Sequence, residues 1–184
     1  MGTRHFRPEV TIMQKNFHSS VQNFVVNGFG IGVVRNMGPK GYLDCICKFL
    51  KKVNLEELSN KGPSQYPKFL DQQTEKLVRH MPREARHWGV ARKCLNLFFR
   101  DALYNFYLRE KYNLAKFEKY LEIPLDSYVG RKLQAENKGL PRWRTVKSLK
   151  REISDRFQEV AKKVAKQKGT ERVHLDVLYW RGGQ

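Results

Sequence analysis

Acidic residues and cysteines are both scarce in this chain of 184 residues. Asp and Glu total 18 against 36 Lys and Arg, which leaves a formal net charge of +18. The three cysteines, Cys45, Cys47 and Cys94, form no paired spacing, which argues against a disulfide scaffold and favours a reducing, intracellular setting. They are also too few for a zinc or iron–sulfur site made of four cysteines.

Long apolar runs and metal-ligand spacings are absent as well. No run approaches the roughly 18 apolar residues that a membrane span requires, and residues 1–5 lack the apolar stretch of a secretory signal. None of the five histidines stands at a metal-ligand spacing from cysteine or acid. We therefore expect an intracellular protein of the cytoplasm, nucleoid or nucleus that contacts no membrane and holds no metal or cofactor.

The residues that are abundant indicate a folded, basic domain. Hydrophobic residues make up 40% of the chain and aromatics 12%, which is enough for a core and excludes a disordered basic tail. At about 150 residues per domain, residues 1–184 predict a single domain. The excess of positive charge favours DNA or RNA as the partner over a scaffold whose charges only coat solvated helices.

The spacing of apolar residues predicts helices along most of the chain, and hence an all-α domain. Asp126 precedes one of these helices as an N-cap, and Gly169 ends another. Residues 170–180 fit either a helix or a strand, and we favour a helix because no other segment of the second half offers a sheet to join. The helices are expected at residues 43–50, 69–81, 90–110, 114–121, 127 onward and 153–164.

Residues 1–60 are the part that the sequence places least well. Residues 21–26 fit either a short strand or a helical turn. The glycine-dense residues 28–32 lack the full dinucleotide fingerprint and the Gly-Lys-Ser/Thr ending of a phosphate loop. They therefore predict a loop or turn rather than a nucleotide site.

A helix–turn–helix pair occupies the centre of the chain, with the turn at residues 82–89. Gly89 stands where the second helix begins, and the first-turn N–H groups of such a helix can seat a DNA phosphate. The alternative is that the glycine serves only the packing of two helices. Positive charge at the phosphate seat would come from Arg86, Arg92 and Lys93.

Three segments, in order along the chain, resemble the helix-hairpin-helix DNA glycosylases. Residues 88–93, Trp-Gly-Val-Ala-Arg-Lys, are similar to the hairpin and catalytic-lysine helix of that family. Residues 122–129, Glu-Ile-Pro-Leu-Asp-Ser-Tyr-Val, are similar to its second signature, in which an aspartate opens a helix. The separation of 33 residues between Lys93 and Asp126 resembles that of the archaeal 8-oxoguanine branch. Residues 174–180 resemble the C-terminal helix of that branch.

The resemblance, which covers residues 69–180, implies a helix-hairpin-helix bundle and a DNA N-glycosylase with AP-lyase activity. Lys93 would be the amine nucleophile at C1′ of the deoxyribose, and the Asp126 carboxylate would stabilise the positive charge of the sugar. The substrate would be duplex DNA with a flipped oxidised base, with 8-oxoguanine as the first choice, bound by a monomer. The residues expected to hold the flipped base are Asp176 and Trp180, with Trp88 or Phe98 facing it.

Each of these residues also has an ordinary structural interpretation. Lys93 can be a solvated or phosphate-contacting side chain, and Asp126 can be only a helix cap. Trp180 can be a packing residue, and Asp176 can pair with Arg172 one turn away. A non-enzymatic nucleic-acid-binding protein that uses the same hairpin is therefore the alternative function, and a protein–protein scaffold is a third.

Overall fold

The computed structural model describes the backbone of residues 8–181 and the side chains of residues 16–179. Within those residues the chain forms helices and no β-strand, so the predicted all-α class is confirmed. The α-helices are α1 (Pro8–Asn27), α2 (Tyr42–Leu50), α3 (Leu55–Ser59), α4 (Tyr66–His80), α5 (Trp88–Tyr104), α6 (Phe106–Lys111), α7 (Ser127–Glu136), α8 (Arg151–Gln167) and α9 (Leu175–Arg181). Short 3-10 helices are η1 (Ile31–Val33), η2 (Pro63–Gln65), η3 (Arg83–Ala85), η4 (Leu114–Tyr120) and η5 (Arg172–His174).

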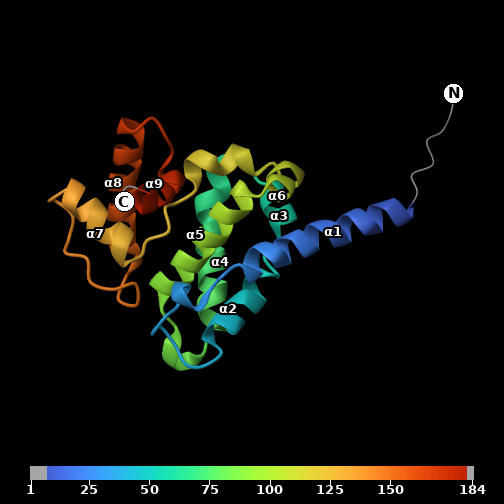
Figure 1. Cartoon of the computed structure of the whole chain (residues 1–184), viewed down its shortest axis with the longest axis horizontal. Helices are drawn as coiled ribbons and strands as arrows, with labels where there is room; N and C mark the ends of the chain where they lie inside the picture. Colours follow the sequence, from blue (N-terminus) through green and yellow to red (C-terminus); the bar gives the residue numbers. More distant parts are fainter. Residues whose placement is uncertain (1–7, 182–184) are drawn as a thin grey trace.

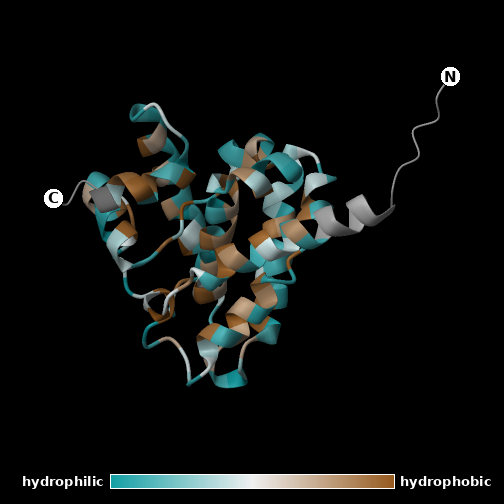
Figure 2. Cartoon of the chain, turned by 45° about the vertical axis from the view of Figure 1, so that its right-hand side comes forward, coloured by the Kyte–Doolittle hydropathy of each residue, from teal (hydrophilic) through white to brown (hydrophobic). Residues whose placement is uncertain are grey.

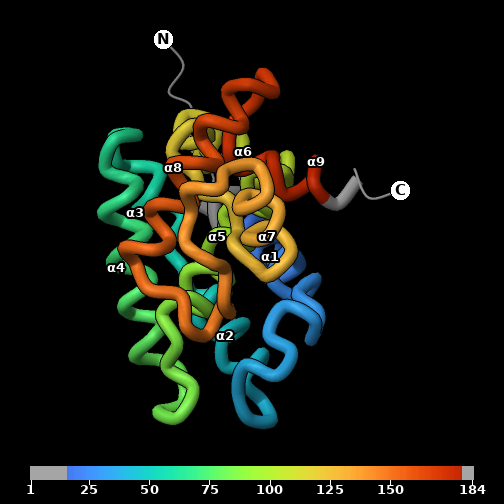
Figure 3. The backbone as a smooth tube through the Cα atoms, turned by 90° about the vertical axis from the view of Figure 1, so that its left-hand side faces the viewer, coloured from blue at the N-terminus to red at the C-terminus, as the bar shows by residue number. Residues whose placement is uncertain are grey.

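Helices α4 and α5 form the centre of the molecule, and the other helices pack around them (Figure 1). Helices α1 and α2 lie on one side of this pair, while α7, α8 and α9 gather on the other (Figure 1). Figure 3 views the chain from the side of α7 and α8. Helix α5 therefore contacts both the first part of the chain and the last part.

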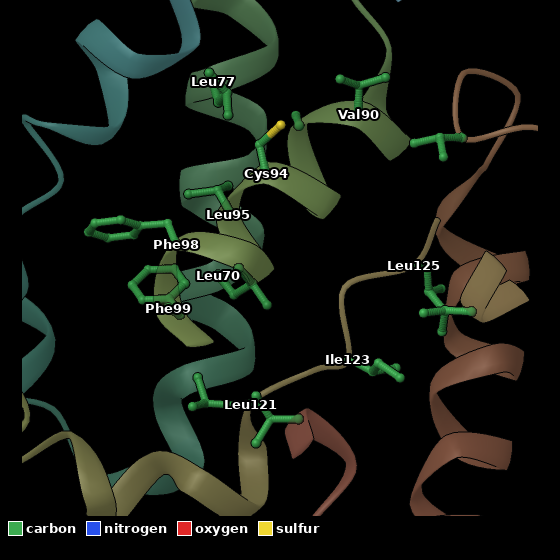
Figure 4. Packing of buried hydrophobic residues seen from close by; sticks show 14 of the residues in the cluster. Leu70, Leu77, Val90, Cys94, Leu95, Phe98, Phe99, Leu121, Ile123 and Leu125 are labelled. Carbon is green, nitrogen blue, oxygen red and sulfur yellow. The ribbon is translucent and has the colours of Figure 1, made fainter. Parts of the chain in front are cut away.

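The core is built where the apolar faces of α4 and α5 meet. Phe98 and Phe99 of α5 are fully buried or nearly so, and their ring centroids lie 5.2 Å apart. Leu70 of α4 is buried beside them, and Leu77, two turns along α4, is buried near Cys94 (Figure 4). Each such side chain contributes about 1.5–3 kcal/mol by leaving water. The buried apolar residues form one cluster that extends from Val26 to Tyr179.

Helix α8 lies at the edge of this core, with an apolar face turned toward the core and a charged face turned toward solvent. Phe157, Ala161 and Val164 recur at helical spacing and are buried, whereas Lys162 and Lys163 between them are exposed. Figure 2 shows the same division along other helices, with hydrophobic stretches toward the interior and hydrophilic residues on outer turns. None of the helices in the described part of the chain is both long and apolar enough to cross a membrane.

The helix expected at residues 90–110 is two helices, which corrects the prediction. Helix α5 ends at Tyr104, and Asn105 takes an extended conformation with φ −78° and ψ 115°. Its side chain accepts a hydrogen bond from the Leu108 amide and so caps α6. Asparagine competes for backbone donors in this way, and one such residue is enough to interrupt a helix whose apolar stripe continues.

The ambiguous segments at both ends of the chain are helical. Residues 21–26 lie in α1, and residues 28–30 form a turn that leads into η1, which contains residues 31 and 32. Residues 172–181 form η5 and α9, so the preference for a helix over a strand is confirmed. Gly169 follows α8 with φ +67°, the left-handed conformation typical of a residue that ends a helix.

Candidate functional site

Lys93 lies buried on α5 and reaches the N-terminal part of the chain. Its side chain is only 7% exposed, and its Nζ donates a hydrogen bond of 2.9 Å to the carbonyl oxygen of Val33 in η1. Among the residues with described side chains, no carboxylate forms an ion pair with Lys93. The acceptor thus comes from residues 1–60, the part of the chain that the sequence left unplaced.

Arg92, the neighbour of Lys93, is surrounded by acceptors. Its Nε and Nη2 donate to both oxygens of Glu122 at 2.8 and 2.6 Å, and its Nη1 donates to Asp71 at 2.7 Å. Thr74 accepts from Nη1 as well, at 3.2 Å, and Asn96 donates to Glu122 at 3.0 Å. Arg92 is 5% exposed, so the prediction that it contacts DNA phosphate is wrong. The hydrogen bonds of its guanidinium connect α5 to Asp71 of α4 and to Glu122 in the segment before α7.

Both partners of this ion pair are held in their charged forms. Burial alone would raise the pKa of the Glu122 carboxyl, but Arg92, Arg172 and Asn96 together lower it. Burial alone would lower the pKa of the Arg92 guanidinium, but Glu122 and Asp71 raise it above its usual value. The pKa of Glu122 is lowered and that of Arg92 is raised, so both changes favour the charged forms, as expected for a bidentate pair with further hydrogen bonds.

Asp176 forms an ion pair with a residue that the sequence did not suggest. Its carboxylate contacts the Arg100 guanidinium of α5, which also binds Asp101 at 2.7 Å. Arg172, the partner weighed from the sequence, donates to the carbonyl oxygens of Leu121 and Tyr120 at 2.9 Å each. Asp176 is 3% exposed, so it is not open to a flipped base in this structure. The Trp180 side chain lies outside the described residues.

Asp126 acts as the N-cap of α7, as its position before the helix predicted. Its Oδ1 accepts hydrogen bonds of 2.9 Å from the amides of Tyr128 and Val129. The side chain is partly exposed. No hydrogen bond or ion pair joins it to Lys93 in the described part of the structure. Lys93 is bonded to Val33 in η1, whereas Asp126 is bonded to the first turn of α7.

Gly89 is a packing residue, which corrects its assignment as a phosphate seat. A Cβ at this position would lie 2.2 Å from the Val146 carbonyl oxygen and 2.6 Å from Cβ of Leu149. The segment between α7 and α8 therefore covers the start of α5. The amides of Val90 and Ala91 both donate to the His87 carbonyl oxygen rather than to solvent.

The remaining predicted site residues also have structural partners. Arg86 is exposed, and its guanidinium donates to the carbonyl oxygens of Met81 and Arg79 at 3.2 Å, at the end of α4. Phe98 is fully buried, so the prediction that it faces a base is wrong. Trp88 is partly buried beneath the Arg92 guanidinium, which lies 5.5 Å from the ring centroid.

Sequence reasoning missed one face of α5, whose polar side chains contact Val33 of η1 and residues 174–176. The residues that we call the Lys93 stripe recur at positions i, i+4, i+7 and i+11, so they share one face of the helix. At the C-terminal end of this face, the Tyr104 hydroxyl lies 2.8 Å from Nδ1 of His174, and Nε2 of the same His174 lies 2.7 Å from Oε1 of Glu118. The spacing was visible in the sequence, but the partners come from segments far away. The stripe consists of Lys93, Leu97, Arg100 and Tyr104.

Comparisons with known proteins do not assign this arrangement to a family. Among the residues with described side chains, no group of three His, Cys, Asp or Glu could hold a metal ion. Neither protein-family models nor curated proteins nor solved structures match the chain.

Proposed function

We propose that the protein is a DNA N-glycosylase with AP-lyase activity, in which Lys93 is the nucleophile. One observation carries the proposal. Of the cations of α5, the buried Arg92 and the partly buried Arg100 each bind two carboxylates, whereas Lys93, among the residues with described side chains, has a carbonyl oxygen as its partner and no carboxylate. A buried cation that serves only stability is normally paired with acids, so the lone amine suggests a chemical role.

The chemistry needs only groups that the chain contains. The neutral Lys93 amine attacks C1′ of the deoxyribose while the bond from C1′ to the base nitrogen breaks, and the proton that the amine loses goes to the departing base. The C1′–O4′ bond of the sugar then opens, O4′ takes up a proton, and a Schiff base remains between Lys93 and C1′. Loss of a proton from C2′ then eliminates the 3′ phosphate, which cleaves the strand. The carboxylate of Asp126 would stabilise the positive charge that develops on the sugar, provided that bound DNA brings the sugar between the two groups.

The choice of base depends on the resemblance to the archaeal 8-oxoguanine glycosylases. Phe98 is excluded as a base contact by its burial, and Asp176 is engaged by Arg100. Trp88 and Leu97, which are only partly buried, remain near Lys93 along α5. An oxidised purine, with 8-oxoguanine as the first choice, is therefore proposed as the substrate.

The direct test is covalent trapping. Duplex DNA with one 8-oxoguanine is incubated with the protein in the presence of borohydride, which reduces a Schiff base to a stable link. We expect the wild type to be trapped and Lys93→Met, which retains a side chain of similar length, not to be trapped. Lys162→Met, at an exposed lysine of α8, is the matched control and should be trapped like the wild type. A wild type that neither releases the base nor is trapped would overturn the proposal.

A non-enzymatic nucleic-acid-binding protein is the second candidate. It is favoured by the net charge of +18 and by a run of exposed cations between α7 and α8. It predicts salt-dependent DNA binding that survives Asp126→Asn, with no base release by the wild type. The burial of Gly89 means that such binding would not use the hairpin between α4 and α5.

A further inference from the structure

The segment between α7 and α8 is the most uniformly basic part of the chain. Residues 138–151 contain no Asp or Glu, and all of their cations are exposed. Trp143, Val146 and Leu149, at intervals of three, are buried between them. The alternation turns apolar side chains inward and positive charge outward. The cations are Lys138, Arg142, Arg144, Lys147, Lys150 and Arg151.

The segment is fixed in place although it has no regular secondary structure. Trp143 fits against Gly130 of α7, where a Cβ would meet the indole ring at 2.3 Å, and its ring centroid lies 5.2 Å from that of Phe157. The Gln134 side chain donates to the Pro141 carbonyl oxygen at 3.0 Å. Because the backbone is packed in this way, the points at which the outward side chains leave the chain are fixed before any ligand binds.

A pocket of about 460 Å³ lies within this segment and the start of α8. Arg142, Arg144 and Lys150 line it, and none of the three forms a hydrogen bond or ion pair within the part of the chain that the structure describes. No acidic residue lines it. The first turn of α8 begins at Arg151 and no side chain caps it, so amide donors of this turn stand beside the pocket; Glu152 lies in the same turn but does not line the pocket. The other lining residues are Pro141, Trp143, Thr145, Ser148, Leu149 and Ile153.

We propose that this pocket, the 141–153 pocket, binds backbone phosphates of duplex DNA. Val146 and Leu149 of the same segment cover Gly89 at the start of α5, four residues before Lys93. The segment thus occupies the position at which the hairpin was expected to contact DNA, and it presents its own cations there. The choice of duplex DNA as the ligand rests on the proposed function, whereas phosphate binding can be measured without catalysis.

Ordinary surface lysines and arginines also attract DNA, so the proposal needs a charge-matched comparison. The test variant carries Arg142→Gln, Arg144→Gln and Lys150→Gln. The control variant carries Lys162→Gln, Lys163→Gln and Lys166→Gln, three exposed residues of α8 outside the pocket. Both variants lose three positive charges. Fluorescence anisotropy with a labelled duplex, repeated over a range of salt concentrations, gives the affinity and its salt dependence for each variant.

We expect the test variant to lose at least about tenfold in affinity near 0.1 M salt. Its slope of log K against log salt should fall by about 2.7, because each phosphate contact contributes about 0.9. The control should stay close to the wild type. Equal weakening of both variants, or of neither, would overturn the pocket proposal.

The outcome is separable from that of the trapping experiment. A wild type that is not trapped, together with selective weakening of the test variant, would remove the glycosylase and keep the pocket. If the wild type is trapped and the test substitutions leave the DNA affinity unchanged, the glycosylase proposal stands and the pocket proposal is overturned.

Discussion

Asp126 can be tested apart from the helix that it caps, because asparagine retains a side-chain oxygen for the two amides. Asparagine and aspartate cap helices about equally well, so Asp126→Asn should change the free energy of unfolding by less than about 0.5 kcal/mol. Base release in a single turnover should fall by about a hundredfold or more, since the charge that stabilises the sugar is lost. Thermal unfolding and a base-release assay measure the two effects.

Substitution of Asp126 by alanine tests its role as a helix cap together with its role as a charge. Asp126→Ala removes the hydrogen bonds to Tyr128 and Val129 as well as the charge, and it should cost about 1 kcal/mol of stability. If Asp126→Asn released the base at the wild-type rate, Asp126 would be a cap alone.

Gly89 gives a second prediction for a single residue. Gly89→Ala would place a methyl group 2.2 Å from the Val146 carbonyl oxygen, a backbone atom that cannot move aside cheaply. Overpacking of about 1–3 kcal/mol exceeds the helix propensity gain of up to about 1 kcal/mol, so we expect a net loss of stability. Gly32→Ala, where nothing lies within 4 Å, is the control and should leave the thermal midpoint unchanged. A Gly89→Ala protein as stable as the wild type would contradict this packing.

Local signals in the sequence were sufficient for some site residues and not for others. The cap at Asp126 follows from its position before a helix, and the structure has it there. The burial of Arg92 does not follow from its surroundings, because its partner Glu122 is 30 residues away. Likewise, the acceptor of Lys93 lies 60 residues earlier in the chain. Spacing along one helix predicts a shared face, but it does not say which segment will cover that face.

At the scale of the elements, the Arg92–Glu122 ion pair joins α5 to the segment that leads into α7. Arg92→Met would leave the Glu122 carboxylate buried without its counter-ion, and such losses cost about 3–5 kcal/mol. Arg151→Met removes a partly exposed pair with Asp71 and should cost less than about 1 kcal/mol. Denaturant unfolding of the two variants measures the difference. Equal effects of both would mean that the buried pair does not connect these elements.

The same ion pair should make the protein less stable as the pH is lowered. Glu122 has a lower pKa in the folded protein than its usual value, so its contribution is complete above about pH 4.3, the value for an unperturbed Glu. The contribution is lost as the pH falls through the folded pKa. Glu122→Gln should therefore lose less stability on acidification than the wild type, as followed by thermal unfolding between pH 6 and about pH 3. Parallel loss in both proteins would assign the acid sensitivity to other groups.

Elements were predicted well where the apolar pattern was interrupted by glycine or proline and poorly where it was not. The end of α8 at Gly169 is such a case. Between Leu103 and Leu108 the apolar stripe continues, and only the side chain of Asn105 separates α5 from α6. The hydrogen bond that divides the two helices is a local competition that periodicity does not record.

At the scale of the whole molecule, the net charge of +18 should make stability depend on ionic strength. Like charges on a compact surface repel, and the screening length shortens from about 30 Å at 0.01 M salt to about 8 Å at 0.15 M. The thermal midpoint should therefore rise over this range, while buried pairs such as Arg92–Glu122 are screened much less. The two triple-glutamine variants should show a smaller rise. A midpoint that falls with added salt would contradict the dominance of repulsion.

The order of synthesis gives the ion pair between Arg100 and Asp176 a further consequence. The two residues are 76 positions apart, so at about 5–20 residues per second Arg100 is translated roughly 4–15 s before its partner. During that interval Asp101, the next residue in the chain, can already neutralise the guanidinium. Helix α5 can thus pack on α4 during synthesis, and the ion pair between Arg100 and Asp176 forms only after α9 has been translated.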